Sequence, residues 1–252
     1  MSGTGDIEAF IIHLARAEAR RSQVDRIRSD CPLPVRILDA VDGRALSPAD
    51  IDAVYCRSGL HTPRYPFEPT IGEIGCFLSH RKAWQAIVAS GLEAGLVFED
   101  DVQVDTTAFR AALDLARTHI SQYGIIQFQV REITDQGPAI ASADAVRLTR
   151  PVLVPLRASC TLYSRQAAQQ LLDRTLRFDR PVDTFMQMHW LTGLRPLIAV
   201  PSGVGDNSRE IGGTTIQAKN LPWLKRLRRE VLRPLYRARI RALSRSNDQP
   251  PD

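Results

Sequence analysis

Three consecutive carboxylates end a short apolar segment of this chain. Residues 95–98 read GLVF, and Glu99, Asp100 and Asp101 follow them directly. Like charges at the end of a buried strand repel one another, and a divalent cation or hydrogen bonds from a loop commonly offset that cost. Because side chains alternate along a strand, Glu99 and Asp101 should share one face while Asp100 points elsewhere. The pattern predicts a metal site at Glu99 and Asp101, and the competing interpretation is a solvated acidic turn.

A block with two glycines and a histidine precedes these acids. Residues 72–80 read GEIGCFLSH and enter an amphipathic helix that the pattern ends near Gly91. Histidine changes charge near neutral pH, so His80 is suited to binding a phosphate or orienting a carboxylate, although most lone helix histidines are structural. Ser79 and His80 are therefore candidates for the same site as the acidic cluster.

The elements before this block predict the fold. An apolar run at residues 9–14, a polar helix-compatible stretch at 18–29 and a second apolar run at 35–38 form a βαβ pattern. Such a unit implies a parallel sheet, and ligands bind beyond the carboxyl ends of its strands. We predict an α/β domain with a mainly parallel central sheet, whose ligand-binding edge carries residues 99–101.

A further aspartate lies far along the chain. Asp183 follows Pro181 and Val182 and precedes a helical run. An aspartate before a helix commonly caps it, whereas an aspartate facing a reacting hydroxyl acts as a general base. Both interpretations stay open here. The loop at residues 206–208 offers one more potential metal ligand.

The order G-E-[IL]-G-C-x-x-S-H, apolar strand, E-D-D resembles glycosyltransferase family 25, which includes bacterial lipooligosaccharide galactosyltransferases and collagen galactosyltransferases. In this chain the block spans residues 72–101. Weaker similarity covers the first strand with Arg20, the segment at 39–43, and residues 159–183. Together these segments cover most of residues 7–211, and only the central block is specific by itself.

The resemblance implies a GT-A-like domain that binds a uridine diphosphate sugar. The residues that it implies for donor binding are His13, Arg20, Asp39, Asp42, Ser79, Glu99 and Asp100. His13 departs from the family, which usually has Asn there, and it suits a hydrogen-bonded core histidine equally well. Arg20 has the alternative of a solvated helix face, and Asp39 and Asp42 have that of a turn ending in Gly43.

The reaction implied by the resemblance is transfer of a hexose, galactose by family precedent, to a saccharide of lipopolysaccharide or lipooligosaccharide, with inversion. Mn²⁺ or Mg²⁺ held by Glu99 and Asp101 would neutralise the leaving diphosphate. Asp183 matches the family's Pro-[IV]-Asp residue and is the implied base for the acceptor hydroxyl. His80 is the second predicted catalytic residue.

Composition is that of a globular protein kept in a reducing compartment. The chain has 252 residues, of which 44% are apolar, and four cysteines without a Cys-x-x-Cys pair. The cysteines are expected to be free thiols. Because we find neither a long apolar run nor a signal-peptide pattern, we expect a cytoplasmic protein.

The positive charge of the chain lies in its C-terminal part. Residues 225–252 hold nine Lys or Arg residues and three Asp or Glu residues, whereas the whole chain has a net charge of +5. We predict a GT-A-like domain over residues 1–220, a basic amphipathic helix over 221–244 and a disordered tail over 245–252. The helix is expected to lie on an anionic membrane surface, with packing of its apolar stripe on the domain as the alternative.

That helix suggests a peripheral protein on the inner face of the bacterial cytoplasmic membrane, with a lipid-linked oligosaccharide as acceptor. Two other classes of function compete with a transferase. One is a catalytically inactive member of the fold that binds a glycan or a partner. The other is a nucleic-acid-binding module, but the tail holds only Trp223 and Tyr236 as aromatic residues, so we expect no nucleic acid.

Overall fold

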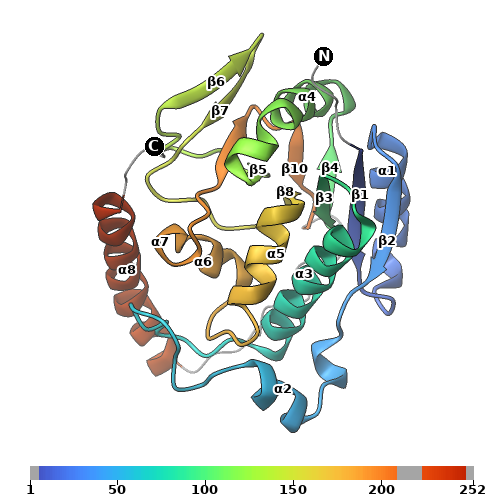
Figure 1. Cartoon of the computed structure of the whole chain (residues 1–252). Helices are drawn as coiled ribbons and strands as arrows, with labels where there is room; N and C mark the ends of the chain where they lie inside the picture. The colour runs from blue at the N-terminus through green and yellow to red at the C-terminus, as the bar shows by residue number, and fades with distance from the viewer. Residues whose placement is uncertain (1–5, 209–222, 248–252) are drawn as a thin grey trace.

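The computed structural model describes residues 6–208 and 223–247, with side chains in the second range described from residue 229 onward. Its centre is an eight-stranded sheet in the order β2-β1-β3-β8-β5-β9-β7-β6 (Figure 1). The strands are β1 (Ile7–His13), β2 (Val35–Asp39), β3 (Ala94–Glu99), β5 (Ile125–Phe128), β6 (Ala139–Ala143), β7 (Val146–Thr149), β8 (Cys160–Ser164) and β9 (Leu197–Val200).

Strand directions make the sheet mainly parallel. β1 pairs in parallel with β2 and β3, and β5 pairs in parallel with β9. β8 is inserted antiparallel between β3 and β5, and β7 runs antiparallel to β9 and β6. The predicted α/β class with a mainly parallel central sheet is confirmed. The antiparallel position of β8 was not predicted, and it has consequences for the site.

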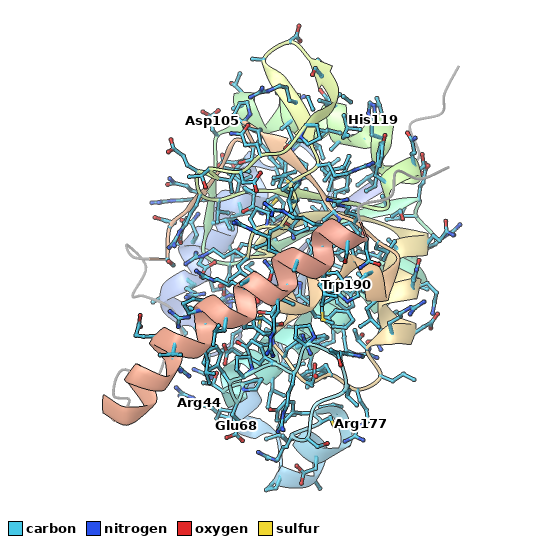
Figure 2. The ribbon with its side chains drawn as sticks, turned by 90° about the vertical axis from the view of Figure 1, so that its left-hand side faces the viewer. Arg44, Glu68, Asp105, His119, Arg177 and Trp190 are labelled. Atoms are coloured by element: carbon cyan, nitrogen blue, oxygen red, sulfur yellow. The ribbon has the colours of Figure 1, made fainter. Side chains whose placement is uncertain are left out.

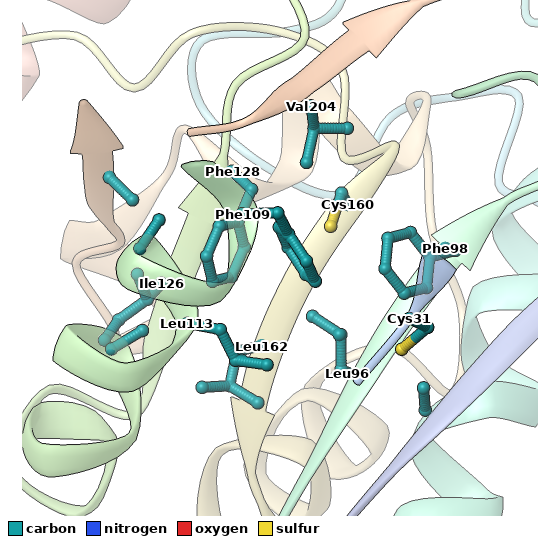
Figure 3. Packing of buried hydrophobic residues seen from close by; sticks show 14 of the residues in the cluster. Cys31, Leu96, Phe98, Phe109, Leu113, Ile126, Phe128, Cys160, Leu162 and Val204 are labelled. Atoms are coloured by element: carbon teal, nitrogen blue, oxygen red, sulfur yellow. The ribbon is translucent and has the colours of Figure 1, made fainter. Parts of the chain in front are cut away.

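Helices cover both faces of the sheet. They are α1 (Arg21–Asp30), α2 (Pro48–Val54), α3 (Ile71–Ser90), α4 (Thr106–Tyr123), α5 (Arg165–Arg174), α6 (Val182–Met186), α7 (His189–Thr192) and α8 (Trp223–Ser246). On one face, α1 and α4 pack on a core that includes Phe98, Phe109 and Leu162 (Figure 3). On the other, α3 and α5 pack on a core around Phe77 and Trp84. Burial of both faces holds the strand ends in fixed positions.

The first turn of α3 is fixed by a capping box. The hydroxyl of Thr70 accepts the amide hydrogen of Glu73, and the Glu73 carboxylate accepts that of Thr70. Farther along, Gly75 lies so close to the turn after β2 that an added Cβ would be 2.6 Å from the carbonyl oxygen of Val41. Glycine is required there, because it allows the turn and the helix to form one wall of a cavity.

Helix α8 crosses the surface of the sheet domain (Figure 2). Tyr236, Ile240 and Ser244 are buried against it, whereas Val231 and Leu235 are 56% and 57% exposed. The alternative prediction was that the helix packs on the domain through an apolar stripe that includes Val231 and Leu235. For these two residues that prediction is wrong. The helix continues to Ser246, past the predicted end at 244. The rest of the predicted disordered tail, residues 248–252, lies outside the described residues, and the domain division at residue 220 stays a prediction.

All four cysteines are free, as predicted. Among the described residues, none of the helices has the length and apolar content needed to cross a bilayer.

Candidate active site

A cavity of about 330 Å³ lies beyond the carboxyl ends of β1, β2 and β3, the sheet edge that the βαβ pattern indicated. Its walls are the loop after β1, the turn after β2, the first turns of α3 and the end of β3. Of the predicted site residues, it is lined by Arg20, Asp42, Ser79, His80, Glu99, Asp100 and Asp101. His13, Asp39 and Asp183 are not in its lining.

Glu99 is held by three donors. The Ser159 hydroxyl lies 2.6 Å from Oε2, and His80 Nε2 and the Cys76 thiol lie 3.2 Å and 3.7 Å from Oε1. Burial alone would raise the pKa of Glu99, but the hydrogen bonds and charge of His80 and the bond from Ser159 outweigh it and lower that pKa. Glu99 is thus an ionised carboxylate in a fixed orientation, and His80 is one of the groups that orient it.

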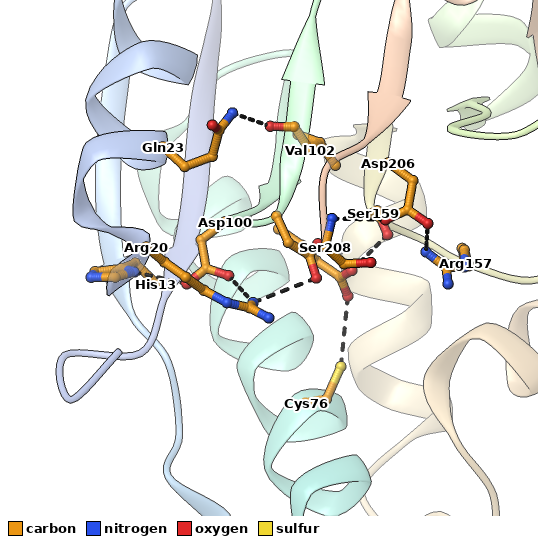
Figure 4. A network of polar contacts seen from close by, with 12 residues as sticks. His13, Arg20, Gln23, Cys76, Asp100, Val102, Arg157, Ser159, Asp206 and Ser208 are labelled. Atoms are coloured by element: carbon orange, nitrogen blue, oxygen red, sulfur yellow. Dashed lines mark hydrogen bonds and ion pairs between the residues drawn. The ribbon is translucent and has the colours of Figure 1, made fainter. Parts of the chain in front are cut away.

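Asp100 is turned toward the elements after β1. His13 Nδ1 lies 2.8 Å from Oδ2 and Arg20 Nη1 lies 2.5 Å from Oδ1, with all three residues buried (Figure 4). Because Arg20 is only 7% exposed, the interpretation of a solvated helix face is wrong. Arg20 and Asp100 form an ion pair, so a donor sugar would meet Arg20 as a member of this pair and not as a free cation.

Asp101 has the opposite environment to Glu99. Its nearest cation is Arg20, whose Nη1 lies 3.4 Å from Oδ2. Burial, together with the negative charge of Glu99, raises the pKa of Asp101 to about 7. Two partly buried carboxylates that repel each other fit a divalent cation, because a hard cation with oxygen ligands removes the repulsion. The donor set of Glu99 and Asp101 therefore suits Mg²⁺ or Mn²⁺.

A second set of potential ligands shares Glu99. One ligand atom each from Cys76, His80 and Glu99 lie within 4.8 Å of one another, a mixed S, N, O set that would suit Zn²⁺ better than Mn²⁺. Burial, and secondarily the charge of Glu99, raises the pKa of the Cys76 thiol well above its usual value. In this structure the Cys76 thiol donates to Glu99 and His80 contacts the same carboxylate, so both residues orient it.

Asp183 lies in the first turn of α6. Its carboxylate accepts the amide hydrogens of Thr184 at 2.6 Å and of Arg157 at 3.3 Å. Pro181 occupies the N-cap position, so Asp183 is not the N-cap residue, but its carboxylate still accepts an amide hydrogen in the first turn of the helix. Burial, together with the charge of Glu99, raises the pKa of Asp183. A buried carboxyl with a raised pKa near a cluster of acids is suited to accepting a proton.

Ser79 and Asp42 hold the cavity walls, whereas Asp39 does not. The Ser79 hydroxyl accepts the amide hydrogen of Val41 at 2.8 Å and donates to the carbonyl of Gly75. Asp42 pairs with Arg16 through its two oxygens at 2.5 Å and 3.2 Å. Asp39 is exposed at the end of β2 and, among the described side chains, its carboxylate makes none of the recorded hydrogen bonds or ion pairs.

Four residues near the acids come from distant parts of the chain. Asp206, at the end of β10 (Val204–Asp206), accepts hydrogen bonds from Arg131 and Arg157 at 2.7 Å and 2.8 Å. The amide of Asn207 donates to the backbone oxygen of Asp101, because β10 pairs with β4 (Val102–Val104) directly after the acidic cluster. The loop at 206–208 was predicted to lie near the metal site. Ser159 and Arg157 were not, and we find no local signal that would have identified either.

The sequence model described as "Glycosyltransferase family 25 (LPS biosynthesis protein)" matches residues 6–141. Procollagen galactosyltransferase 1 of Danio rerio is 30% identical over 192 residues, which are 71% of this chain and 30% of that protein. Inactive glycosyltransferase 25 family member 3 of Mus musculus is 28% identical over 245 residues, or 88% of this chain and 41% of that protein.

The chain thus spans less than half the length of these curated relatives. Solved structures are similar at a low level. The 4-diphosphocytidyl-2C-methyl-D-erythritol synthase of Anaerococcus prevotii has a TM-score of 0.42 and 9% identity, covering 82% of this chain and 95% of that one. Mannose-1-phosphate geranyltransferase of Thermus thermophilus has a TM-score of 0.36 and 12% identity, covering 77% and 73%.

Proposed function

The chain belongs to glycosyltransferase family 25, and from this premise we propose that it transfers galactose from a uridine diphosphate sugar to a hydroxyl of a lipopolysaccharide or lipooligosaccharide acceptor. One observation supports the proposal: Glu99 and Asp101 line a cavity at the carboxyl ends of the strands, and the charge of Glu99 raises the pKa of both Asp101 and Asp183. The family description, which names lipopolysaccharide biosynthesis, supports the acceptor.

The cavity suits the nucleotide part of the donor. Arg16, Arg20 and Arg44 are among its lining residues, and guanidinium groups recognise phosphate oxygens with paired hydrogen bonds. Arg16 and Arg20 are already paired with carboxylates, whereas the side chain of Arg44 is exposed and has no ion pair among the described residues. A diphosphate could therefore bind Arg44 without breaking an ion pair, which binding to Arg16 or Arg20 would require.

Glu99 and Asp101 would hold Mg²⁺ or Mn²⁺, which supplies a Lewis acid for the charge of the leaving diphosphate. The chain's own contribution is to keep Glu99 ionised and fixed through Ser159, His80 and Cys76. In this arrangement His80 orients a ligand and does not itself exchange a proton with the substrate.

Asp183 is the proposed general base. The bond between the sugar C1 and the phosphate oxygen breaks, a bond from the acceptor oxygen to C1 forms, and the acceptor proton passes to a carboxylate oxygen of Asp183. Burial raises the pKa of this carboxyl, which favours proton uptake, and Thr184 and Arg157 fix its orientation. Attack from the side opposite the leaving diphosphate inverts the anomeric centre.

The competing function is glycan binding without transfer, since relatives of this chain include proteins named as inactive. A transfer assay with UDP-galactose and a lipooligosaccharide acceptor separates the two, with and without Mn²⁺. We expect Asp101→Asn and Asp183→Asn to abolish transfer. Asp114→Asn, an exposed carboxylate on α4, is the matched control and should behave as wild type. Transfer that survives chelation or Asp101→Asn would remove the metal assignment, and failure to turn over any sugar donor would favour the inactive alternative.

Helix α8 supports a membrane-bound acceptor. Val231 and Leu235 are exposed on the side away from the buried Tyr236 and Ile240, and Arg239, four residues after Leu235, is exposed on the same side. Apolar side chains flanked by arginines are typical of helices that lie on anionic lipid surfaces. Arg180, three positions before Asp183, donates to the Tyr236 hydroxyl at 2.8 Å. A helix that lies on the inner face of the bacterial cytoplasmic membrane would therefore bring the acceptor side of the site near a lipid-linked oligosaccharide.

Flotation with vesicles tests this location. We expect the protein to float with vesicles that contain phosphatidylglycerol and not with vesicles of phosphatidylcholine alone, because arginine attraction needs anionic lipid. Replacing both Val231 and Leu235 with Ser should reduce flotation several-fold, whereas Ala238→Ser, on an exposed position of the same helix, should not. Equal flotation of the double variant and the control would exclude α8 as the lipid-binding surface.

A further inference from the structure

Arg157 has an unusual backbone conformation beside the acids. Its φ angle is 78°, and the only other described non-glycine residue with a positive φ is Asp144, which lies between β6 and β7. The left-handed region is costly for a residue with a Cβ, and glycine would adopt it without that cost. Such strain is commonly retained at functional sites, where the side chain or the exact path of the backbone is needed.

The segment at residues 157–159 contacts both sides of the site. The Arg157 amide donates to Asp183 at 3.3 Å, and two residues later the Ser159 hydroxyl donates to Glu99 at 2.6 Å. The backbone oxygen of Ser159 also accepts the amide hydrogen of Glu99 at 2.8 Å. Three consecutive residues, 157–159, therefore contact both the proposed base and the proposed metal ligand.

The Arg157 side chain adds a third connection. Its Nη1 donates to Asp206 at 2.8 Å, and this carboxylate also accepts two bonds from Arg131. The residue after Asp206 donates its amide hydrogen to the backbone oxygen of Asp101 (Figure 4 shows Arg157, Ser159 and Asp206 around the acids). The guanidinium thus ties the segment to the β4–β10 ribbon, which a glycine at this position could not do.

We propose that Arg157 is a positioning residue, which fixes the Asp183 carboxylate relative to Glu99 and Asp101 through its amide and its bond to Asp206. The inference rests on the proposed transfer reaction. A base must lie on the opposite side of the sugar from the leaving diphosphate, so its distance from the metal ligands decides whether the acceptor oxygen is aligned with C1. A displacement of about 1 Å is enough to lower a rate roughly a hundredfold.

Substitution by glycine and by alanine separates the side chain from the backbone strain. Both Arg157→Ala and Arg157→Gly remove the tie to Asp206, and only glycine also removes the strain. We expect kcat to fall at least about tenfold in both, with KM for the nucleotide sugar within about twofold of wild type, because the donor cavity is not lined by Arg157. Arg157→Gly should melt at a higher temperature than Arg157→Ala without recovering kcat.

Arg131→Ala is the matched control, because Arg131 also pairs with Asp206 but is outside the connecting segment. It should leave kcat within about twofold of wild type, as expected for a half-exposed ion pair. Wild-type kcat in Arg157→Gly would overturn the proposal, since relief of strain would then be the only role of that position. An equal loss of kcat in Arg131→Ala would overturn it as well, by assigning the effect to the charge of Asp206.

A double-mutant cycle tests the bond between Arg157 and Asp206 and does not need an activity measurement. The melting temperatures of Arg157→Ala, Asp206→Asn and the double variant should be clearly non-additive, because the two groups contact each other. Additive shifts would show that the tie does not exist in solution and would overturn the proposal. If the wild type transfers no sugar, the proposed function and the positioning role fail together, while a non-additive cycle would still confirm the connection itself.

Discussion

Three neighbouring carboxylates have three different environments at the end of β3. Glu99 is fixed by donors, Asp100 is hydrogen-bonded to His13 and Arg20, and Asp101 is partly buried with Arg20 3.4 Å away as its cation. β3 ends at Glu99, and Asp100 and Asp101 lie in the turn after it, so strand alternation does not set their directions, and Arg20 contacts both. The partners were not predictable, because they come from β1, α3 and the segment before β8.

The raised pKa of Asp101 gives a pH-dependent stability. The pKa is about 7 in the folded chain and about 4 in an unfolded one, so the stabilising contribution of the neutral group is lost as the pH rises through about 7. In chelator-treated protein, Asp101→Asn should melt at about the same temperature as wild type at pH 5 and at a higher temperature at pH 8. Mn²⁺ should then stabilise wild type and not the variant. A melting difference that does not change with pH would contradict the assigned environment.

Ser159 is expected to contribute more than Cys76 to the orientation of Glu99. Its hydroxyl is 2.6 Å from the carboxylate, whereas the thiol is 3.7 Å away and is a weaker donor. Ser159→Ala should therefore reduce the melting shift caused by Mn²⁺ to well below that of wild type, and Cys76→Ala should reduce it less. The measurement is thermal unfolding over a Mn²⁺ titration, and the reverse order would indicate that the thiol is a metal ligand.

At the scale of elements, the antiparallel strand β8 explains why some site residues could not be predicted from the sequence. The βαβ start predicted β1, β2 and the position of β3, because local patterns of apolar residues specify them. Nothing in residues 160–164 reveals that β8 pairs with β3 over Ala94 to Phe98. That pairing places residues 157–159 against the end of β3. Arg157 and Ser159 therefore reach the site through long-range strand order, which a single sequence does not show.

The contact between α3 and the turn after β2 predicts the effect of a methyl group. In Gly75→Ala the new Cβ would lie 2.6 Å from the Val41 carbonyl oxygen and 2.8 Å from the Gly43 nitrogen, both backbone atoms. We expect a loss of about 1–3 kcal/mol of unfolding free energy and weaker nucleotide binding, because the turn lines the donor cavity.

Urea unfolding and calorimetric titration with UDP check the Gly75→Ala prediction. Gln85→Ala, on the exposed side of the same helix, should change neither quantity by a comparable amount. Unchanged UDP affinity in a destabilised Gly75→Ala would show that the nucleotide does not depend on this wall.

At the scale of the whole molecule, a buried ion pair joins three distant segments. Arg180 is fully buried and pairs with Asp179 at 2.7 Å. It also donates to the backbone oxygens of His61 and Pro63 and to the Tyr236 hydroxyl of α8. The change of composition near residue 220 predicted a separate basic helix, but this network and the buried face of α8 attach that helix to the domain. Composition shows where charge changes, and it does not show which helix face is packed.

The network makes the attachment of α8 measurable. Arg180→Met leaves the Asp179 carboxylate buried without its cation, so we expect a loss of about 3–5 kcal/mol of unfolding free energy. Tyr236→Phe removes one hydrogen bond and should cost about 1 kcal/mol of unfolding free energy, with faster proteolysis within α8 as the first sign.

Adding Asp179→Asn to Arg180→Met should recover part of the lost stability, because the unpaired charge is removed. If the double variant is less stable than Arg180→Met, the carboxylate has a stabilising role of its own, through the amides of Leu60 and His61 that it accepts. The attachment of α8 would then depend on the loop and not on the ion pair.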